Sequence, residues 1–154
     1  MMLLTLRVRS SCRYFEKDKL TQKEKDILIR AIDCGPSSGG LRAYTVYHTE
    51  KENNKNELQK ASLNQKFISQ ASIIFCVCAV PEKSAEKYGE RGELYAVQDA
   101  TIAGMCITFA ATALWLGSCW VGSIETDKIK LILDIPENEI PLSLICIGRW
   151  KDVT

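Results

Sequence analysis

The stretch from Asp99 to Ser123 constrains the fold more than any other part of the sequence. From Ala100 to Leu116 it carries no charged residue, it is rich in alanine and leucine, and a glycine follows. This pattern predicts a buried helix that ends at Gly117. Apolar residues extend most of the way round its axis, so the helix needs covering on nearly every side. After Gly117 the residues are typical of a strand, until Gly122 and Ser123 interrupt it and could turn backbone N–H groups toward a ligand.

Small residues recur in the predicted helix and would allow a second helix, such as the same helix of another subunit, to approach closely. They are Ala103, Gly104, Ala110, Ala111 and Ala113. A membrane span is disfavoured, because the uncharged run falls short of the roughly 18 to 20 residues needed and contains threonines. The sequence therefore predicts a homodimer and no membrane insertion.

Composition limits the function classes. The chain has 154 residues, 46% of them hydrophobic, which fits a single domain over residues 1–154 with its own core. A net charge of +1, with both signs interspersed, offers no basic face for nucleic acid and favours a small-molecule partner. Seven cysteines, mostly inside apolar runs, are typical of reduced core cysteines and give no metal-ligand pattern. We expect a cytoplasmic protein without a metal site.

Helices and strands are predicted to alternate along the chain. Four apolar or alternating segments predict strands: Tyr44–His48, Ile73–Val80, Ser118–Val121 and Leu142–Gly148. Besides the central helix, helices are predicted from a capping box at Thr21–Glu24 through Ile32, over Glu57–Gln70, and from Thr126 to Leu133. Residues 50–56 are predicted to be a surface loop and residues 81–93 a charged connection. This order predicts an α+β fold with a mixed sheet flanked by helices.

Two polar segments are candidates for binding a ligand. Arg9, Ser11 and Arg13 alternate, so an extended backbone would present two guanidinium groups and a hydroxyl on one side, which suits a phosphate. A solvated basic segment is the alternative interpretation. Pro36 ends a helix, and the small residues up to Gly40 form a loop whose backbone could approach a ligand closely. The only histidine, His48, is predicted to be a surface residue, because no nucleophile or carboxylate motif accompanies it.

Four motifs in order resemble the nitroreductase family of flavin-dependent enzymes: R-x-S-x-R from Arg9, PSSGGLR from Pro36, NQKFISQAS from Asn64, and YAVQDATIA with GSCWVGS. PSSGGLR and YGERGELY are most similar to the branch that contains the dehydrogenases of azoline peptides. The resemblance implies a nitroreductase-like fold, FMN held between the two subunits of a homodimer, and NAD(P)H as electron donor. It implies an oxidoreductase that passes hydride through flavin N5 to a small acceptor, such as a nitroaromatic or a quinone, by a ping-pong route without a catalytic side chain. A flavin-dependent dehydrogenase acting on a peptide and a non-catalytic flavin-binding protein are the alternatives.

The resemblance also assigns cofactor-binding residues. Arg9, Ser11 and Arg13 match the segment that binds the flavin phosphate and the polar edge of the ring. Pro36, Ser37 and Ser38 match the loop offered by the partner subunit, and Gly40 stands where many members have asparagine. Asn64, Gln65 and Lys66 fall at the contacts to the pyrimidine end of the ring. Gly122 and Ser123 match the turn whose N–H groups address N5 and O4, and Arg149 is a candidate for the phosphate. Because the long insertion and C-terminal arm of larger relatives have no counterpart here, we expect an open substrate pocket and a weaker subunit contact.

Overall fold

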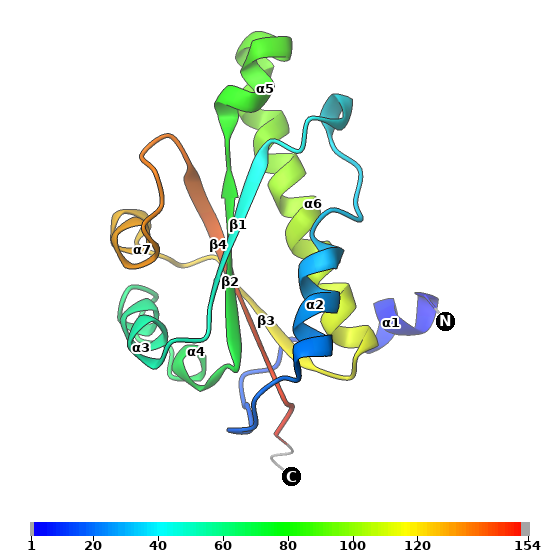
Figure 1. Ribbon diagram of the computed structural model, residues 1–154, viewed down its shortest axis with the longest axis vertical. Helices are drawn as coiled ribbons and strands as arrows, with labels where there is room; N and C mark the ends of the chain where they lie inside the picture. The colour runs from blue at the N-terminus through cyan, green and yellow to red at the C-terminus, as the bar shows by residue number, and fades with distance from the viewer. Residues whose placement is uncertain (1, 152–154) are drawn as a thin grey trace.

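A computed structural model describes residues 2–151 and shows a sheet with helices on both faces (Figure 1). The elements, in chain order, are α1 (Met2–Val8), α2 (Gln22–Ala31), the 3-10 turn η1 (Ser38–Gly40), β1 (Tyr44–Thr49), α3 (Glu52–Lys60), α4 (Phe67–Gln70), β2 (Ile73–Ala79), α5 (Pro81–Tyr88), η2 (Gly89–Arg91), α6 (Gly92–Ala113), β3 (Gly117–Val121), α7 (Thr126–Leu133) and β4 (Ile140–Gly148). The predicted α+β class is confirmed.

The sheet has four strands in the order β1-β2-β4-β3, and every neighbouring pair is antiparallel. The sequence predicted a mixed sheet, with parallel and antiparallel pairs, but the four strands pair only in the antiparallel sense. A parallel bridge between Ser11 and Ser118 adds the N-terminal segment to β3. Every residue of β2 is buried, as its continuous apolar run predicts for a central strand covered on both faces.

Alternate residues of the strands divide the core into two layers. Phe75 and Ile145 belong to the layer covered by α2 and α6. Cys76 and Cys146 belong to the opposite layer, covered by α3, α4, α7 and the N-terminal segment around Cys12. Figure 1 shows the two groups of helices on opposite sides of the strands.

The central helix differs from its prediction in its bounds and its neighbours. α6 begins at Gly92, before the predicted start at Asp99, and it ends when Trp115 adopts a left-handed conformation at φ +58°, whereas Gly117 already belongs to β3. Ala103, Gly104 and Ala111 are buried against the sheet. A Cβ at Gly104 would lie 2.7 Å from the ring of Trp120. These three small residues therefore let α6 approach the sheet closely, and the interpretation that they face another subunit is wrong.

Three further segments are more helical than predicted. The charged connection contains α5, which starts with Pro81 in its first turn and stops at Gly89, whose φ is +55°. The surface loop of residues 50–56 contains the start of α3, and the predicted helix Glu57–Gln70 is divided into α3 and α4, because Leu63 and Asn64 both have positive φ. α1 was not predicted, and none of its residues is buried.

By length and composition, the stretch Pro81–Ala113 could cross a membrane. Of its most apolar 18-residue window, 44% is buried inside the chain, and α6 packs on the sheet. The core helix of a globular protein can have the same length and apolar composition.

Candidate functional site

The N-terminal segment after α1 lies along β3. Ser11 forms a parallel bridge with Ser118, and the Cys12 N–H donates to the Ser118 carbonyl at 2.8 Å. Burial raises the pKa of the Cys119 thiol, whereas the positive charges of Arg13 and Arg9 act in the opposite direction. Because Ser11 and Cys12 pair with Ser118, Arg9 and Arg13 belong to a segment that lies along the start of β3. The Arg9 side chain is half-buried, and Arg13 is exposed.

β3 leads directly to the predicted turn at Gly122 and Ser123, which are both exposed. Gly122 lies three residues beyond Cys119, or about 10 Å along an extended strand. Apart from the adjacent residues of the chain, no atom lies within 4 Å of the position that a Cβ on Gly122 would occupy. The backbone at this turn is therefore accessible to a ligand.

The segment that contains Asn64, Gln65 and Lys66 reaches the same region. The Glu125 N–H, just after the Gly122 turn, donates to the Ala61 carbonyl at 2.8 Å. The side chain of Asn64 accepts from Gln59 at 2.7 Å, the Gln65 amide donates to the Ser62 carbonyl at 3.0 Å, and Lys66 is exposed. These hydrogen bonds orient two neutral amides close to the end of β3.

The loop from Pro36 to Arg42 lies elsewhere, against α6. The carboxylate of Asp99, only 1% exposed, accepts hydrogen bonds from the Ser38 N–H at 2.8 Å and from the Ala43 N–H at 3.3 Å. A cavity of about 570 Å³ lies between this loop and α6, lined by Pro36, Ser37, Ser38, Val97, Gln98, Asp99, Thr101 and Ile102. The sequence-based prediction found the loop and missed Asp99. One feature of the sequence could have pointed to Asp99: it is the single charged residue between Leu94 and Ala113.

The two groups of predicted residues are attached to different elements. Asp99 holds the Pro36–Ser38 loop on α6, whereas the Arg9–Arg13 segment pairs with the start of β3. β3 runs back along α6, because Trp120 lies against Gly104, five residues or about 7 Å along the helix from Asp99. Within residues 2–151 no hydrogen bond or ion pair joins the loop to the Arg9–Arg13 segment.

Arg149, a predicted phosphate ligand, is bound within the chain. Its guanidinium makes a bidentate ion pair with Glu24 on α2, at 2.6 and 2.9 Å. Burial would raise the pKa of the Glu24 carboxyl, but the hydrogen bonds from Arg149 and Thr21 outweigh burial and lower it. The pair fixes the segment after β4 to α2 and leaves the Arg149 donors engaged.

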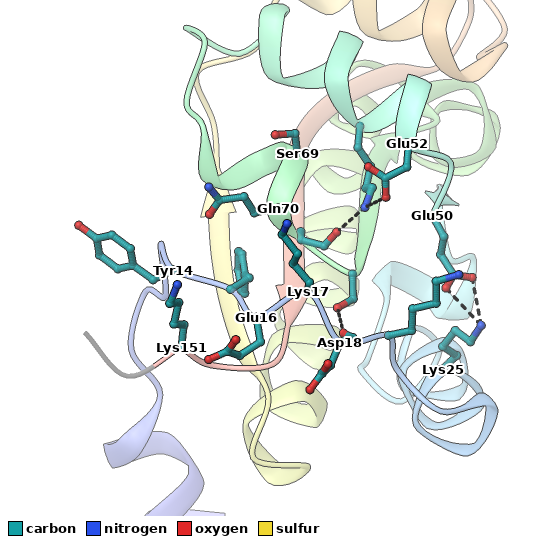
Figure 2. Close-up of a pocket in the computed structure, with 15 residues that line it drawn as sticks. Tyr14, Glu16, Lys17, Asp18, Lys25, Glu50, Glu52, Ser69, Gln70 and Lys151 are labelled. Atoms are coloured by element: carbon teal, nitrogen blue, oxygen red, sulfur yellow. Dashed lines mark hydrogen bonds and ion pairs between the residues drawn. The ribbon is translucent and has the colours of Figure 1, made fainter. Parts of the chain in front are cut away.

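A second cavity, of about 1060 Å³, lies elsewhere and is lined by none of the predicted site residues. Figure 2 shows it between residues 14–19 and the segment Ser69–Ser72, with charged side chains along its walls. Lys25 pairs with Glu50 at 3.1 Å, and Lys55 binds Glu52 at 2.7 Å and the Ala71 carbonyl at 2.9 Å. The groove carries charges of both signs, and several of them already form ion pairs with one another. A lining of mixed charge favours no particular class of charged ligand, so we keep the predicted residues as the candidate site.

Two other predictions concern single residues and metals. His48 is exposed on β1, as predicted for a surface residue, with its ring 5.7 Å from that of Phe75. Within residues 2–151, no group of three or more His, Cys, Asp or Glu side chains is arranged to hold a metal ion.

Comparison with known proteins decides the family. The profile of the nitroreductase family matches residues 49–149. The chain belongs to the nitroreductase family. This nitroreductase-family chain is 26% identical over 153 residues to the FMN reductase (NADPH) of Bacillus subtilis, an alignment that covers 90% of the chain and 61% of the relative. It is 25% identical over 148 residues to a putative NADH dehydrogenase/NAD(P)H nitroreductase of Archaeoglobus fulgidus, covering 94% of the chain and 82% of that protein.

Solved structures agree with the family. The NfrA1 nitroreductase of B. subtilis superimposes with a TM-score of 0.91 at 24% identity, over 100% of this chain and 68% of its own. A nitroreductase family protein of Clostridium novyi NT gives a TM-score of 0.89 at 25% identity, over 99% and 86%. The chain thus contains the common fold of the family, in less than two thirds of the length of the B. subtilis FMN reductase.

Proposed function

We propose that this chain is an FMN-dependent NAD(P)H oxidoreductase that works as a homodimer and passes hydride to a small organic acceptor, such as a nitroaromatic or a quinone, by a ping-pong route. Membership of the nitroreductase family and the names of its relatives, among them FMN reductase (NADPH), support the cofactor and the donor. The observation that carries the proposal is the pairing of the Arg9–Arg13 segment with β3, next to an open glycine turn at the end of that strand.

The residues present fit FMN. Guanidinium groups bind phosphate through charge-assisted hydrogen bonds, so Arg9 and Arg13 would hold the phosphate and the polar edge of the ring. The amides of Asn64 and Gln65 would bind the pyrimidine end, beside Lys66. Because the backbone of Gly122 and Ser123 is exposed, its N–H groups would orient the ring without a side chain in the way. Bound FMN would supply the two-electron hydride chemistry.

This chain's own residues would then support reduction by charge and orientation. Reduction adds negative charge to the ring, which nearby cations and N–H donors stabilise. In this proposal Arg149 has no phosphate contact, because its charge is already paired with Glu24 through Nη1 and Nη2. Arg149 instead fixes the segment after β4.

Two observations support the homodimer. The family resemblance assigns the Pro36–Ser38 loop to the cofactor of the partner subunit, and within residues 2–151 no hydrogen bond or ion pair joins this loop to the Arg9–Arg13 segment. The side of α6 that faces away from the sheet carries Leu94, which is exposed, and Met105, which is half-buried. This side would supply part of the contact.

The test begins with the absorbance spectrum of the purified protein, which should show bound flavin, followed by reduction with NADPH or NADH in the absence of oxygen. Steady-state oxidation of the donor with a nitroaromatic or a quinone should give the parallel double-reciprocal lines of a ping-pong route. Flavin binding without turnover of any free acceptor would favour the peptide dehydrogenase or the non-catalytic flavin-binding protein. Failure to bind FMN would refute the proposal.

A further inference from the structure

Asp99 is an unusual residue for the interior of a helix that packs on a sheet. Its side chain is 1% exposed, and no ion pair joins it to a lysine or arginine of residues 2–151. A buried carboxylate is costly unless its oxygens are hydrogen-bonded. Here the donors are two backbone N–H groups of one loop, those of Ser38 and Ala43. Asp99 therefore holds both ends of the segment between them.

The segment between these two donors would be mobile without such a restraint. Gly39 and Gly40 both have positive φ, of +60° and +69°, which glycine adopts at little cost but which leaves many other conformations open to the unfolded loop. The Arg42 N–H donates to the Ser37 hydroxyl at 3.1 Å, and a Cβ on Gly39 would lie 2.4 Å from the Tyr88 hydroxyl of α5. The loop is thus held by α6, by α5 and by its own turn.

Ala43 connects this restraint to the sheet. Its carbonyl accepts a hydrogen bond from the Val80 N–H at 2.9 Å, at the end of β2, while its own N–H binds Asp99. Ala43 therefore anchors the end of the loop both to α6 and to the sheet. Figure 1 shows the connection between α2 and β1 beside the end of α6 that follows α5.

We propose that Asp99 is a positioning residue for the cofactor site: its carboxylate holds the Pro36–Ser38 loop in the conformation that the other subunit's FMN requires. This inference rests on the proposed function. Asp99 does not touch the cofactor in this assignment. It acts by ordering the loop before binding, which lowers the conformational entropy lost when the ligand is bound.

The decisive substitution is Asp99→Asn, which keeps the size of the side chain. Each N–H group binds a different oxygen of Asp99, so an amide in the same position keeps an acceptor for one of them and presents its NH₂ donor to the other. Loss of one hydrogen bond to a charged acceptor should weaken FMN binding at least about 10-fold. In the flavin-free protein, the amide hydrogens of Ser38 and Ala43 should exchange faster than in the wild type.

Thr108→Val is the matched control. Thr108 is a buried polar residue of the same helix, and its hydroxyl donates to the Gly104 carbonyl within α6 at 3.0 Å. Valine has nearly the same shape. This variant removes a buried hydrogen bond from α6 without touching the loop, so FMN affinity and exchange at Ser38 and Ala43 should stay at the wild-type level.

A second pair of variants tests the contact if Asp99→Asn does not fold. Ser38→Pro removes the Ser38 N–H, and it suits the start of a 3-10 turn after Ser37, whose φ and ψ of −139° and 157° are allowed before proline. Ser38→Ala keeps the N–H and removes only the hydroxyl. Ser38→Pro should bind FMN more weakly than Ser38→Ala.

The outcomes separate this inference from the proposed function. If the wild type binds FMN and Asp99→Asn binds it equally well with unchanged exchange at Ser38 and Ala43, the positioning role is wrong. Equal affinities for Ser38→Pro and Ser38→Ala would contradict it in the same way. If the wild type binds no FMN, the proposed function fails, while the exchange rates still report whether Asp99 orders the loop.

Discussion

Substitution of Gly122 by valine should weaken cofactor binding without destabilising the folded chain. Gly122 is exposed, its φ lies outside the left-handed region, and nothing apart from the adjacent residues of the chain occupies the 4 Å around the position of a new Cβ. A surface substitution of this kind changes the free energy of unfolding by less than about 0.5 kcal/mol. Gly104→Val is the opposite case, because its Cβ would lie 2.7 Å from the Trp120 ring, and we expect that variant to be destabilised by about 1 to 3 kcal/mol or more.

The effect on the cofactor follows from the same open space. If the flavin ring lies against this turn, valine replaces the gap with three methyl-sized groups, which costs about 1 to 3 kcal/mol of overpacking. The N–H contact that is lost adds about 0.5 to 1.5 kcal/mol. Together these terms weaken FMN binding by a factor of about 10 to 1000.

The assay is quenching of FMN fluorescence by the flavin-free protein, with thermal unfolding measured on the same samples. Ser123→Ala is the control, because the proposed contact uses the backbone and the variant should bind FMN like the wild type. If Gly122→Val folds normally and binds FMN with wild-type affinity, the turn does not belong to the site, and the assignment of its N–H groups is refuted.

Three more expectations follow from particular side chains. Arg9→Ala or Arg13→Ala should weaken FMN binding by about 1.5 to 3 kcal/mol and riboflavin binding less, in the same fluorescence titration; equal losses for both ligands would contradict a phosphate contact. Glu24→Gln should lower the free energy of unfolding by about 1 kcal/mol at pH 7 in urea titrations. The folded state lowers the pKa of Glu24 below its ordinary 4.5, so the stabilisation is present above that pH and is lost as the pH falls below it. Wild type and variant should therefore have the same free energy of unfolding in acid. A constant difference down to pH 2 would exclude the Arg149 ion pair as the source of the stabilisation. Met105→Glu, on the side of α6 away from the sheet, should give a folded monomer in sedimentation that has lost FMN, whereas a flavin-loaded dimer would show that this side lies outside the contact.

Local signals in the sequence predicted the elements whose cause is itself local. The capping box at Thr21 and Glu24 forms with both of its hydrogen bonds, and α2 follows it. The all-apolar run of β2 is a fully buried central strand, and α7 begins at Thr126 as predicted. In each case the residues that determine the structure are neighbours in the chain.

The features that the sequence did not show concern partners that are distant in the sequence. The sequence predicted a central helix covered on nearly every side, but it could not show that Gly104 faces Trp120 of the same chain. The Arg149 guanidinium suits a phosphate, and only the fold shows that Glu24, 125 positions earlier, binds it. Asp99 was treated as the border of an uncharged run, because its two donors lie 56 and 61 residues away. Each of these three features depends on a contact between residues that are far apart in the chain, and such contacts are not visible in the sequence.

The two faces of α6 fit a site shared between two copies of the chain. One face, with Ala103 and Ala111, is buried against the sheet, so the loop held by Asp99 and the segment paired with β3 are attached to one framework. Two copies related by a twofold axis would place the loop of each beside the arginines of the other. Such an arrangement would also cover the apolar residues of α1, which are exposed in the single chain. The site would then be a property of the pair, with each chain supplying a preformed half.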